Sequence, residues 1–411
     1  MESSRKFDVA IAGAGPAGLA TALFLVKNRP ALARRIVAIE KSAHPRFKVC
    51  AGGLIPKTML ALDELGIPLD VPAVEVIRGE ANTPVGRVDL SRGGDVLATV
   101  IRRDRFDAML ARAATDAGIE IVQRDRVLDV AQDANGVRVS TERNVFEAQV
   151  LVGADGSGSL VRRAVFGAAK ETIGRALMTD IAVDPERTPE FTSRRYRFDF
   201  RCVSRGLSGY CWSFPCLIGG APHLNVGIYD QHPRESTENG GEQSRVTAAL
   251  VAAFPELPLD GLKRPATRWH SFPIRWFDAR DSYGRGRVVL AGDAAGVDPL
   301  MGEGISCAFE HGKLAANAIV QYLDGDGGTL RAYDRALHEG AVGKKLGKLA
   351  FAARHFYGPH HRLFFRIAGV SRRAREIGVD WYNGARHLDE VPTRRLIARW
   401  ARAVLLGEPV R

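Results

Sequence analysis

The sequence predicts a mixed α/β and α+β fold, with a Rossmann-type nucleotide-binding domain interrupted by an antiparallel β-sheet and followed by a helical C-terminal region. Three observations carry this prediction. The first forty residues read as strand, glycine turn, helix and strand. Apolar residues then alternate along several short segments in the middle of the chain, as in antiparallel strands. A buried-strand pattern returns later, before a long helix, so we expect four segments, at 1–173, 174–280, 281–325 and 326–411.

The glycine turn near the N-terminus fits nucleotide binding. Gly13 permits the tight turn after the first strand, Gly15 lets the backbone approach a pyrophosphate, and Gly18 lets the helix pack on the strand. The N-terminus of the helix expected at 19–27 offers free N–H groups and the positive end of its dipole to phosphates. Glu40, which ends the second strand, is placed to accept hydrogen bonds from a ribose. An ordinary βαβ unit is the alternative, but the strands, helix and acid all fit the nucleotide interpretation.

Apolar periodicity places the other elements in order. Helices are expected at 56–65, 103–117, 243–254 and 304–323, with further helices after residue 329. Strands of the first segment are expected at 74–78, 96–101, 120–123, 127–131, 136–141 and 146–152. Strands of the second segment are expected at 176–183, 196–203, 209–214 and 224–229. Pro215 is expected to end the third of these strands, because proline cannot donate to a ladder.

Composition narrows the class of protein. The 411 residues, 26% of them charged, are ordinary for a folded chain of two or three domains. A net charge of +11 suits an anionic ligand, a membrane surface or nucleic acid, but the charge is dispersed and no nucleic-acid motif appears, so we expect no nucleic-acid partner. The sequence contains no run of 18 apolar residues, so we expect no helix that spans a membrane. The five cysteines lack metal-ligand spacing, so we expect free thiols, no metal and a cytoplasmic location.

Two more segments, Gly153-Ala154-Asp155-Gly156 and Gly292-Asp293, follow the glycine turn in the order and approximate spacing of FAD-dependent oxidoreductases related to p-hydroxybenzoate hydroxylase. The chain resembles that superfamily up to about residue 323. A tighter resemblance, to the geranylgeranyl reductase family, rests on residues 48–54 (KVCAGGL), 210–215 (YCWSFP) and 225–227 (NVG). One departure is Ala51, where relatives often carry glycine. The resemblance implies that 1–173 and 281–325 are two parts of an FAD-binding domain and that 174–280 is a substrate domain.

The resemblance also implies a set of cofactor-binding residues. Asp293 would accept from a ribityl hydroxyl, Arg103 would contact the phosphates, and Asp155 would fix its own turn rather than do chemistry. The turn at 302–305 would present N–H groups that stabilise a reduced flavin. The expected set is Gly13, Gly15, Ala17, Gly18, Glu40, Lys41, Cys50, Ala51, Gly52, Arg103, Val127, Asp155, Gly156, Arg162, Gly292, Asp293, Pro299, Gly302, Gly304 and Ile305.

Two features have a functional and a purely structural interpretation. Cys50 is either a catalytic residue beside the isoalloxazine, as the resemblance implies, or a small buried hydrophobic residue. Tyr210, Trp212 and Phe214 alternate along one strand and therefore share a face. With Pro215 they form either the apolar wall of a lipid tunnel or an ordinary half-buried sheet surface. Glu303 is read as a solvated acid at a helix start, without a catalytic role.

The resemblance implies an FAD-dependent reductase that saturates C=C bonds of a geranylgeranyl or other isoprenoid chain. An aromatic hydroxylase or halogenase and a non-catalytic flavin- and lipid-binding protein are the alternatives. No second glycine motif of this kind is seen, so NAD(P)H or another electron donor would bind transiently. The basic stretches around Lys344, Lys345 and Lys348 and at 394–400 fit either peripheral contact with a membrane or a solvated face packed on the body.

Overall fold

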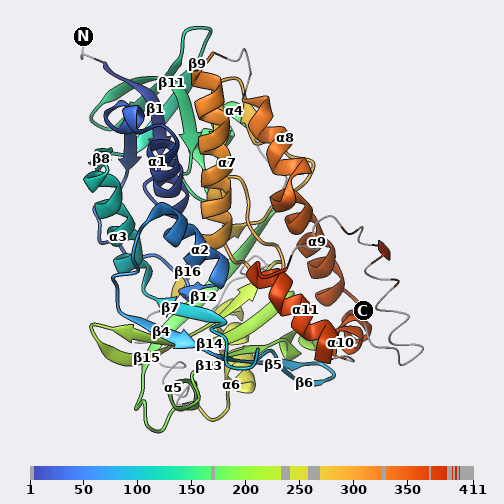
Figure 1. Cartoon of the computed structure of the whole chain (residues 1–411). Helices are drawn as coiled ribbons and strands as arrows, with labels where there is room; N and C mark the ends of the chain where they lie inside the picture. Colours follow the sequence, from blue (N-terminus) through green and yellow to red (C-terminus); the bar gives the residue numbers. More distant parts are fainter. Residues whose placement is uncertain are drawn as a thin grey trace.

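The computed structural model describes residues 4–167, 172–232, 241–257, 269–325, 330–369, 372–386, 391, 394, 395 and 398. Its two larger sheets occupy different parts of the molecule, one in the upper half of Figure 1 and one in the lower half. The predicted mixed fold is confirmed, because a largely parallel sheet covered by helices is joined to a largely antiparallel one.

The upper sheet has the strand order β17-β18-β11-β1-β2-β8, with β9 and β10 attached beside β11. Its central pairs β11–β1, β1–β2 and β11–β18 are parallel. Since β18 follows the whole lower sheet in the chain, the polypeptide leaves this sheet and returns to it late. The strands are β1 (Arg5–Ala12), β2 (Ile36–Glu40), β8 (Glu120–Gln123), β9 (Val127–Gln132), β10 (Val137–Thr141), β11 (Val145–Gly153), β17 (Gly284–Arg285) and β18 (Val288–Leu290).

The lower sheet has the strand order β16-β12-β15-β14-β13-β5-β6. It is antiparallel except for β5 and β13, which pair in parallel, so the expected sheet is mixed at one end. Its strands are β5 (Arg78–Thr83), β6 (Gly86–Asp89), β12 (Ile173–Ala182), β13 (Arg195–Asp199), β14 (Gly209–Ile218), β15 (Ala221–Asp230) and β16 (His270–Arg275). A small third sheet contains β3 (Gly53–Leu54), β4 (Ala73–Val76) and β7 (Ala98–Ile101).

Helices cover both sheets (Figure 1). The α-helices are α1 (Pro16–Asn28), α2 (Pro56–Leu65), α3 (Arg103–Asp116), α4 (Leu160–Phe166), α5 (Pro189–Thr192), α6 (Gly241–Ala253), α7 (Ile305–Leu323), α8 (Arg331–Glu339), α9 (Ala341–Phe356), α10 (His361–Gly369) and α11 (Arg372–Asn383). Short 3-10 helices include η1 (Pro30–Arg35), η2 (Arg201–Arg205) and η4 (Gly292–Ala294).

Close packing of α7 on α1 sets the geometry of the upper half. A Cβ on Gly312 of α7 would lie 2.8 Å from the backbone nitrogen of Thr21 on α1, so the two helices touch through their backbones. Ile11, Phe24 and Phe309 are buried in the same core cluster around this contact. The N-termini of α1 and α7 consequently end near the same cavity, which both of them line.

Several element boundaries differ from the predictions, and three of the differences have a clear physical reason. Helix α1 begins at Pro16 rather than residue 19, because proline suits the first helical position. Strand β13 ends at Asp199, whose carboxylate accepts from the backbone nitrogen of Arg201 at 2.9 Å and turns the chain into η2. Pro215 does not end β14, which continues to Ile218. Pairing with β13 stops at Ser213, so β14 has an unpaired side where the missing N–H breaks no ladder.

Candidate functional site

A single cavity of about 820 Å³ connects the glycine turn of the upper half to the lower sheet. One end is lined by backbone and charged groups that follow β1, β2, β11 and β18. The other end is lined by aromatic and aliphatic side chains of β5, β13, β14, α10 and α11. We call these the polar end and the aromatic end.

The glycine turn forms the floor of the polar end. Gly13 has φ +104°, and a Cβ there would lie 2.3 Å from the carbonyl oxygen of Ala154. A Cβ on Gly18 would lie 1.9 Å from the carbonyl oxygen of Gly13, so α1 starts directly against the turn. Gly15 is different, because only the end of the Arg46 side chain would come near, at 3.4 Å. The backbone at Gly15 is thus open toward the cavity, and α1 has no side-chain cap at its N-terminus.

Glu40 lies where β2 ends and is 4% exposed. Its carboxylate accepts from the backbone nitrogens of Ala14 at 3.2 Å and Ser42 at 3.1 Å. Arg46 forms an ion pair with it at 3.3 Å. The carboxylate is therefore held in one position at the edge of the cavity, with further acceptor capacity for a ribose hydroxyl.

Arg103 opens α3 and lines the cavity as a second fixed charge. Its guanidinium donates to both carboxylate oxygens of Asp107, at 2.8 and 2.9 Å. Burial opposes the charge of Arg103, but Asp107 outweighs burial and raises the pKa of the guanidinium. Arg46 also pairs with Asp107, at 3.3 Å, so one buried carboxylate orients two arginines toward the polar end.

Asp155 fixes the turn after β11. One of its carboxylate oxygens accepts from the backbone nitrogens of Leu160 at 2.7 Å and Val161 at 3.1 Å, which ties the turn to the start of α4. The other oxygen is buried and has no hydrogen-bond partner among the described residues. Burial raises the pKa of this carboxyl. The carboxylate therefore fixes the turn beside the cavity, which Asp155 and Gly156 both line.

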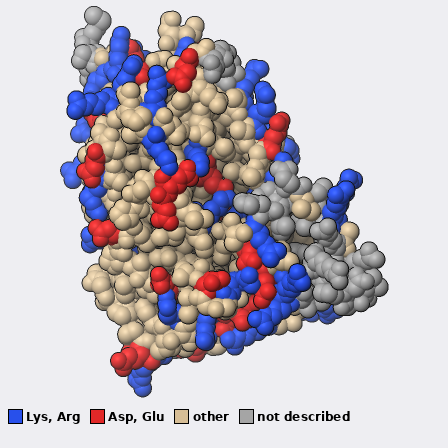
Figure 2. All heavy atoms as spheres, in the orientation of Figure 1, with Lys and Arg blue, Asp and Glu red and all other residues tan. Residues whose placement is uncertain are grey.

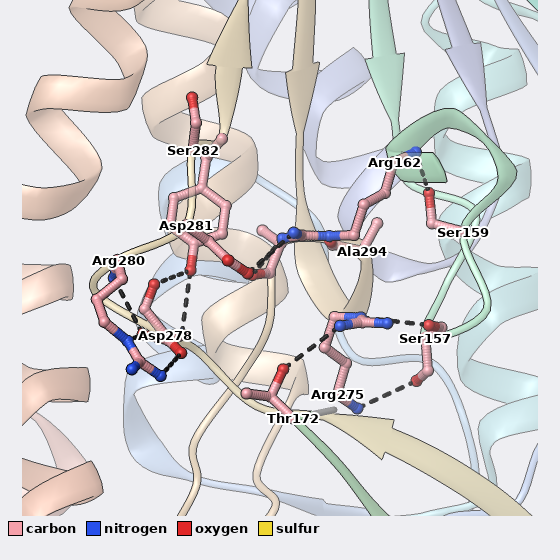
Figure 3. A network of polar contacts seen from close by, with 12 residues as sticks. Ser157, Ser159, Arg162, Thr172, Arg275, Asp278, Arg280, Asp281, Ser282 and Ala294 are labelled. Atoms are coloured by element: carbon pink, nitrogen blue, oxygen red, sulfur yellow. Dashed lines mark hydrogen bonds and ion pairs between the residues drawn. The ribbon is translucent and has the colours of Figure 1, made fainter. Parts of the chain in front are cut away.

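Arg162 connects the turn at 153–156 to the turn at 292–293 on the side away from the cavity lining (Figure 3). Its Nε donates to the carbonyl oxygen of Ala294 at 2.8 Å, and its Nη1 pairs with Asp281 at 3.0 Å. Beside it, Arg275 donates to the carbonyl oxygen of Ser157 at 3.4 Å (Figure 3). The Ser157 hydroxyl in turn lies 3.1 Å from a carboxylate oxygen of Asp293. This network locks the turn after β11 to the turn after β18.

Asp293 lines the cavity directly after Gly292. Gly292 has φ +61°, and its backbone nitrogen donates to Nδ1 of His311 at 3.1 Å. His311 is fully buried, and burial lowers the pKa of its imidazole to about 4, so it is neutral and can accept. The neutral imidazole therefore holds the turn that aims the Asp293 carboxylate into the cavity.

Three tyrosine hydroxyls hold the loop before α7. Tyr229 donates to the carbonyl oxygen of Pro299 at 3.2 Å, Tyr357 to Leu300 at 2.5 Å and Tyr210 to Met301 at 2.5 Å. The loop leads through Gly302 to Ile305, the first residue of α7. This helix end faces the cavity, and the Glu303 carboxylate accepts from one of its free N–H groups, so the others remain for a ligand.

Glu303 starts this helix as predicted but is not solvated. Its carboxylate accepts from the backbone nitrogen of Ser306 at 2.8 Å and from the Ser306 hydroxyl at 2.5 Å. The side chain lines the cavity, and burial raises the pKa of its carboxyl. The expectation of an exposed acid was wrong because the loop folds inward.

The loop at 48–52 crosses the middle of the cavity. Gly52 has φ +82° and a Cβ there would lie 2.0 Å from the carbonyl oxygen of Ile101, which presses this loop onto β7. Cys50 is half-buried, lines the cavity and accepts from the backbone nitrogen of Gly52 through Sγ at 3.3 Å. The amino group of Lys48 lies 3.0 Å from the centre of the Phe272 ring, and burial lowers its pKa to about 8.

The aromatic end begins at Tyr210, Trp212 and Phe214, which face the cavity from β14. Nε1 of Trp212 donates to Oδ1 of Asn225 at 2.8 Å, so this indole is fixed. Tyr196 of β13 stacks on Phe214 with 5.2 Å between ring centres, and Phe198 meets Phe214 edge-on at 5.4 Å. Two strands thus contribute one continuous aromatic wall.

The structure brings most of the predicted site residues to this cavity. Its lining includes Gly13, Gly15, Ala17, Glu40, Lys41, Cys50, Ala51, Gly52, Arg103, Val127, Asp155, Gly156, Tyr210, Trp212, Phe214, Gly292, Asp293, Gly302, Gly304 and Ile305. Four predicted residues, Gly18, Arg162, Pro299 and Pro215, are not among the lining residues. The first three support the lining from behind, through the contacts given above.

Sequence reasoning missed other lining residues. Tyr196 and Phe198 had a signal, since they alternate with the same period of two as the residues of β14. Lys48 also lines the cavity, and the motif KVCAGGL by itself indicates no role for it. Tyr382 and Arg375 of α11 also line the cavity, and no local pattern distinguished them.

Most of the basic C-terminal residues that the structure describes lie on or near α9. Lys345 is buried, and its amino group donates to the carbonyl oxygen of Tyr382 at 2.7 Å. Leu346 and Leu349, which a membrane face would need, are buried in the core. This part therefore packs on the body, while 394–400 lies largely outside the described residues. No helix among the described residues is long and apolar enough to span a membrane, and Figure 2 shows acids interspersed among the Lys and Arg residues of the visible face.

The polar end fits FAD. The uncapped N-terminus of α1 and the open glycine turn suit a pyrophosphate, and Glu40 and Asp293 are placed to accept from hydroxyl groups. Comparisons with known proteins agree. The sequence profile described as "FAD binding domain" matches residues 6–342.

Similar proteins have more than one activity. The chain is 28% identical to the chloroplastic geranylgeranyl diphosphate reductase of Oryza sativa, over 78% of this chain and 68% of that protein. It is 24% identical to 3-hydroxybenzoate 6-hydroxylase of Klebsiella oxytoca, over 91% and 96%. A geranylgeranyl bacteriochlorophyll reductase-like protein of Thermoplasma acidophilum has the same fold, with a TM-score of 0.74, 21% identity and coverage of 95% and 99%. The chain therefore belongs to the FAD binding domain family and is an FAD-dependent oxidoreductase of the superfamily that contains both geranylgeranyl reductases and flavin hydroxylases.

Proposed function

We propose that the protein reduces C=C bonds of an isoprenoid chain, of geranylgeranyl type or a close relative. The observation that carries this proposal is the aromatic end of the cavity. A Cβ on Gly53 would lie 3.2 Å from the Phe214 ring, so β14 meets the loop that carries Cys50, and Phe200 lies 5.4 Å from Phe365 of α10 between ring centres. Residues of β13, β14, α10 and α11 line the same cavity. A long hydrocarbon chain would bury its surface along such a wall, whereas a small polar aromatic substrate would leave much of it empty.

Some residues of the site would bind the cofactor, and others would exclude water from the substrate. Glu40, Arg103 and Asp293 would hold the cofactor, and reduced FAD supplies a hydride when it is bound. An unactivated double bond resists hydride attack, so close placement and a dry surrounding must supply much of the effect. Trp212 and Phe214 provide both, because each is under 8% exposed and fixed by its neighbours.

Cys50 is our candidate for the catalytic proton donor. Saturation of a double bond needs one proton in addition to a hydride, and the Sγ of Cys50 lies at the cavity surface between the two ends. The backbone nitrogen of Gly52, which donates to this sulfur, would stabilise the thiolate left after transfer. Bulk water would then restore the proton. NAD(P)H or another donor would deliver the electrons in a transient complex.

An aromatic hydroxylase is the second candidate. The Klebsiella hydroxylase aligns with 91% of this chain, more than the reductase from Oryza does. A hydroxylase needs oxygen to reach the cofactor and a ring-sized substrate pocket. The long aromatic wall favours the reductase instead, as do the sequences KVCAGGL and YCWSFP.

Product mass would decide between these functions. The FAD-loaded protein would be reduced with dithionite without oxygen and incubated with a geranylgeranyl lipid. We expect a gain of two hydrogens for each bond reduced, and a loss of that product in Cys50→Ala with FAD content unchanged. Addition of an oxygen or halogen atom in air, without any reduction under anaerobic conditions, would refute the reductase. Tight FAD and lipid binding without product in either condition would indicate a non-catalytic binding protein.

A further inference from the structure

Helix α11 presents one stripe of residues to the cavity. Arg375, Gly378, Val379, Tyr382 and Asn383 all line it. Their spacing of three, four, seven and eight residues is that of a single helix face. With a rise of 1.5 Å per residue, Arg375 lies about 10 Å along the helix axis from Tyr382. The cavity therefore follows α11 for roughly two turns.

The two ends of this stripe differ in their polar partners. The hydroxyl of Tyr382 donates to Asp298 at 2.7 Å, just before the loop that leads into α7. Arg375 lies at the other end of the stripe, and Val88, Leu90 and Phe365 line the same cavity. Among the described residues that β5, β6, β13, β14, α10 and α11 contribute to the lining, Arg375 alone is charged.

The guanidinium of Arg375 has more N–H donors than there are acceptors around it. Nη1 donates to the carbonyl oxygen of Gly369 at 2.6 Å. Among the described residues, Nε is buried without a hydrogen-bond partner, and no carboxylate forms an ion pair with this side chain. Asp89 feels its charge, since hydrogen bonds from Ser91, with a smaller contribution from Arg375, lower the pKa of Asp89. A buried guanidinium with unused N–H donors destabilises the protein unless a ligand accepts hydrogen bonds from those donors.

We propose that Arg375 binds the anionic head group of the chain that occupies the aromatic end. The ligand would be an amphiphile with a phosphate or carboxylate at one end and an apolar chain that follows α11 toward Tyr382 and the Cys50 loop. The planar fork of arginine suits either group through two parallel N–H donors. This inference rests on the proposed function for the occupant of the cavity, and it adds that the substrate carries a negative charge about 10 Å from the residues that face the cofactor end.

Saturated amphiphiles test this proposal apart from the reduction. Dodecyl phosphate, dodecanoate, dodecanol and inorganic phosphate would be titrated calorimetrically into the FAD-loaded protein. We expect dodecyl phosphate or dodecanoate to bind about 10- to 100-fold more tightly than dodecanol, as for a hydrogen-bonded charge. Whichever of the two binds more tightly identifies the head group as phosphate or carboxylate. Competition by inorganic phosphate at similar concentration would overturn the proposal, because the site would then not need a chain.

Three variants assign the preference to one side chain. Arg375→Met should abolish the discrimination between the charged and neutral amphiphiles, and Arg375→Lys should restore part of it. Arg366→Met is the matched control, since Arg366 is exposed on α10 and does not line the cavity. Equal discrimination in Arg375→Met and Arg366→Met would refute the assignment, provided that both variants keep their FAD content and melting temperature.

The test of head-group binding by Arg375 can fail or succeed independently of the test of the reductase function. Dodecyl chains hold no double bond, so head-group recognition can be observed even if no alkene is ever reduced. Reduction of a neutral prenol with the same affinity and rate as its phosphate would keep the proposed function and overturn the role of Arg375.

Discussion

At the polar end of the cavity the contacts come from backbone and from charged groups that are held by their neighbours, whereas at the aromatic end they come from packed rings. Gly13 and Gly52 leave no room for a Cβ, and Glu40 is held by two backbone nitrogens. Tyr196, Phe198 and Phe214, by contrast, hold one another through ring contacts of 5.0 to 5.4 Å between centres.

This difference predicts two kinds of sensitivity. Backbone contacts cannot relax, so changes at the polar end should abolish FAD binding or destabilise the fold. Ring contacts can repack, so volume-conserving changes at the aromatic end should mainly alter the affinity for an apolar ligand.

The largest effect is expected for Gly13→Val. A Cβ 2.3 Å from the carbonyl oxygen of Ala154, at φ +104°, cannot be accommodated without moving the turn. We expect FAD affinity to fall by at least about 100-fold, or the protein not to fold, as measured by flavin absorbance per protein. Gly347→Ala is the control, because nothing lies within 4 Å of a Cβ in that helix position. Normal FAD content in Gly13→Val would contradict the contrast.

Arg162→Met should have the next largest effect. The substitution removes three contacts, to the carbonyl oxygens of Ala294 and Ala295 and to Asp281, and leaves these groups unpaired. Loss of a buried partner of this kind costs about 3 kcal/mol. Urea denaturation would measure the free energy of unfolding, with Arg280→Met as control, since Arg280 is exposed in the same network (Figure 3). Equal losses in both variants would show that the network does not hold the two turns.

His311→Phe should flatten the dependence of stability on pH. The pKa of His311 is lowered from 6.5 to about 4 in the fold, so the unfolded chain binds a proton that the native protein does not. Its contribution to stability is full above pH 6.5 and is lost as the pH falls toward 4, by up to about 3.4 kcal/mol. The variant should lack this loss, while His360→Gln, at an exposed position, should retain it. An unchanged profile in His311→Phe would refute the buried neutral imidazole.

Phe214→Leu should give the smallest effect. The side chain keeps its apolar character but loses the stacked contact with Tyr196, which is expected to cost about 1 kcal/mol of stability. FAD affinity should stay unchanged, and the affinity for a prenyl lipid should fall several-fold. A loss of FAD from this variant would show that the two ends are not independent.

The same contrast explains what could be predicted from the sequence. Local motifs fixed by backbone geometry, such as those of Gly13, Asp155 and Asp293, can be identified from residue type and spacing. The aromatic end was predicted from β14, where Tyr210, Trp212 and Phe214 alternate, and Tyr196 and Phe198 of β13 carry the same signal.

The rest of that end depends on tertiary assembly. β5 and β6 join the lower sheet by parallel pairing with a strand more than a hundred residues away, which no local pattern indicates. The expected end of β14 at Pro215 was wrong for a related reason, since the strand has an unpaired side that only the sheet order reveals. Helix α11 likewise reaches the cavity through contacts such as Tyr382 with Asp298, whose partners are 84 residues apart.

Anaerobic mixing of the reduced protein with a prenyl lipid tests the central claim most directly. The absorbance of oxidised flavin should return when a geranylgeranyl lipid is added, because the chain held along the aromatic wall accepts the hydride. The fully saturated phytanyl lipid should bind but leave the flavin reduced. Absorbance that returns only after oxygen is admitted, whichever lipid is present, would contradict the account.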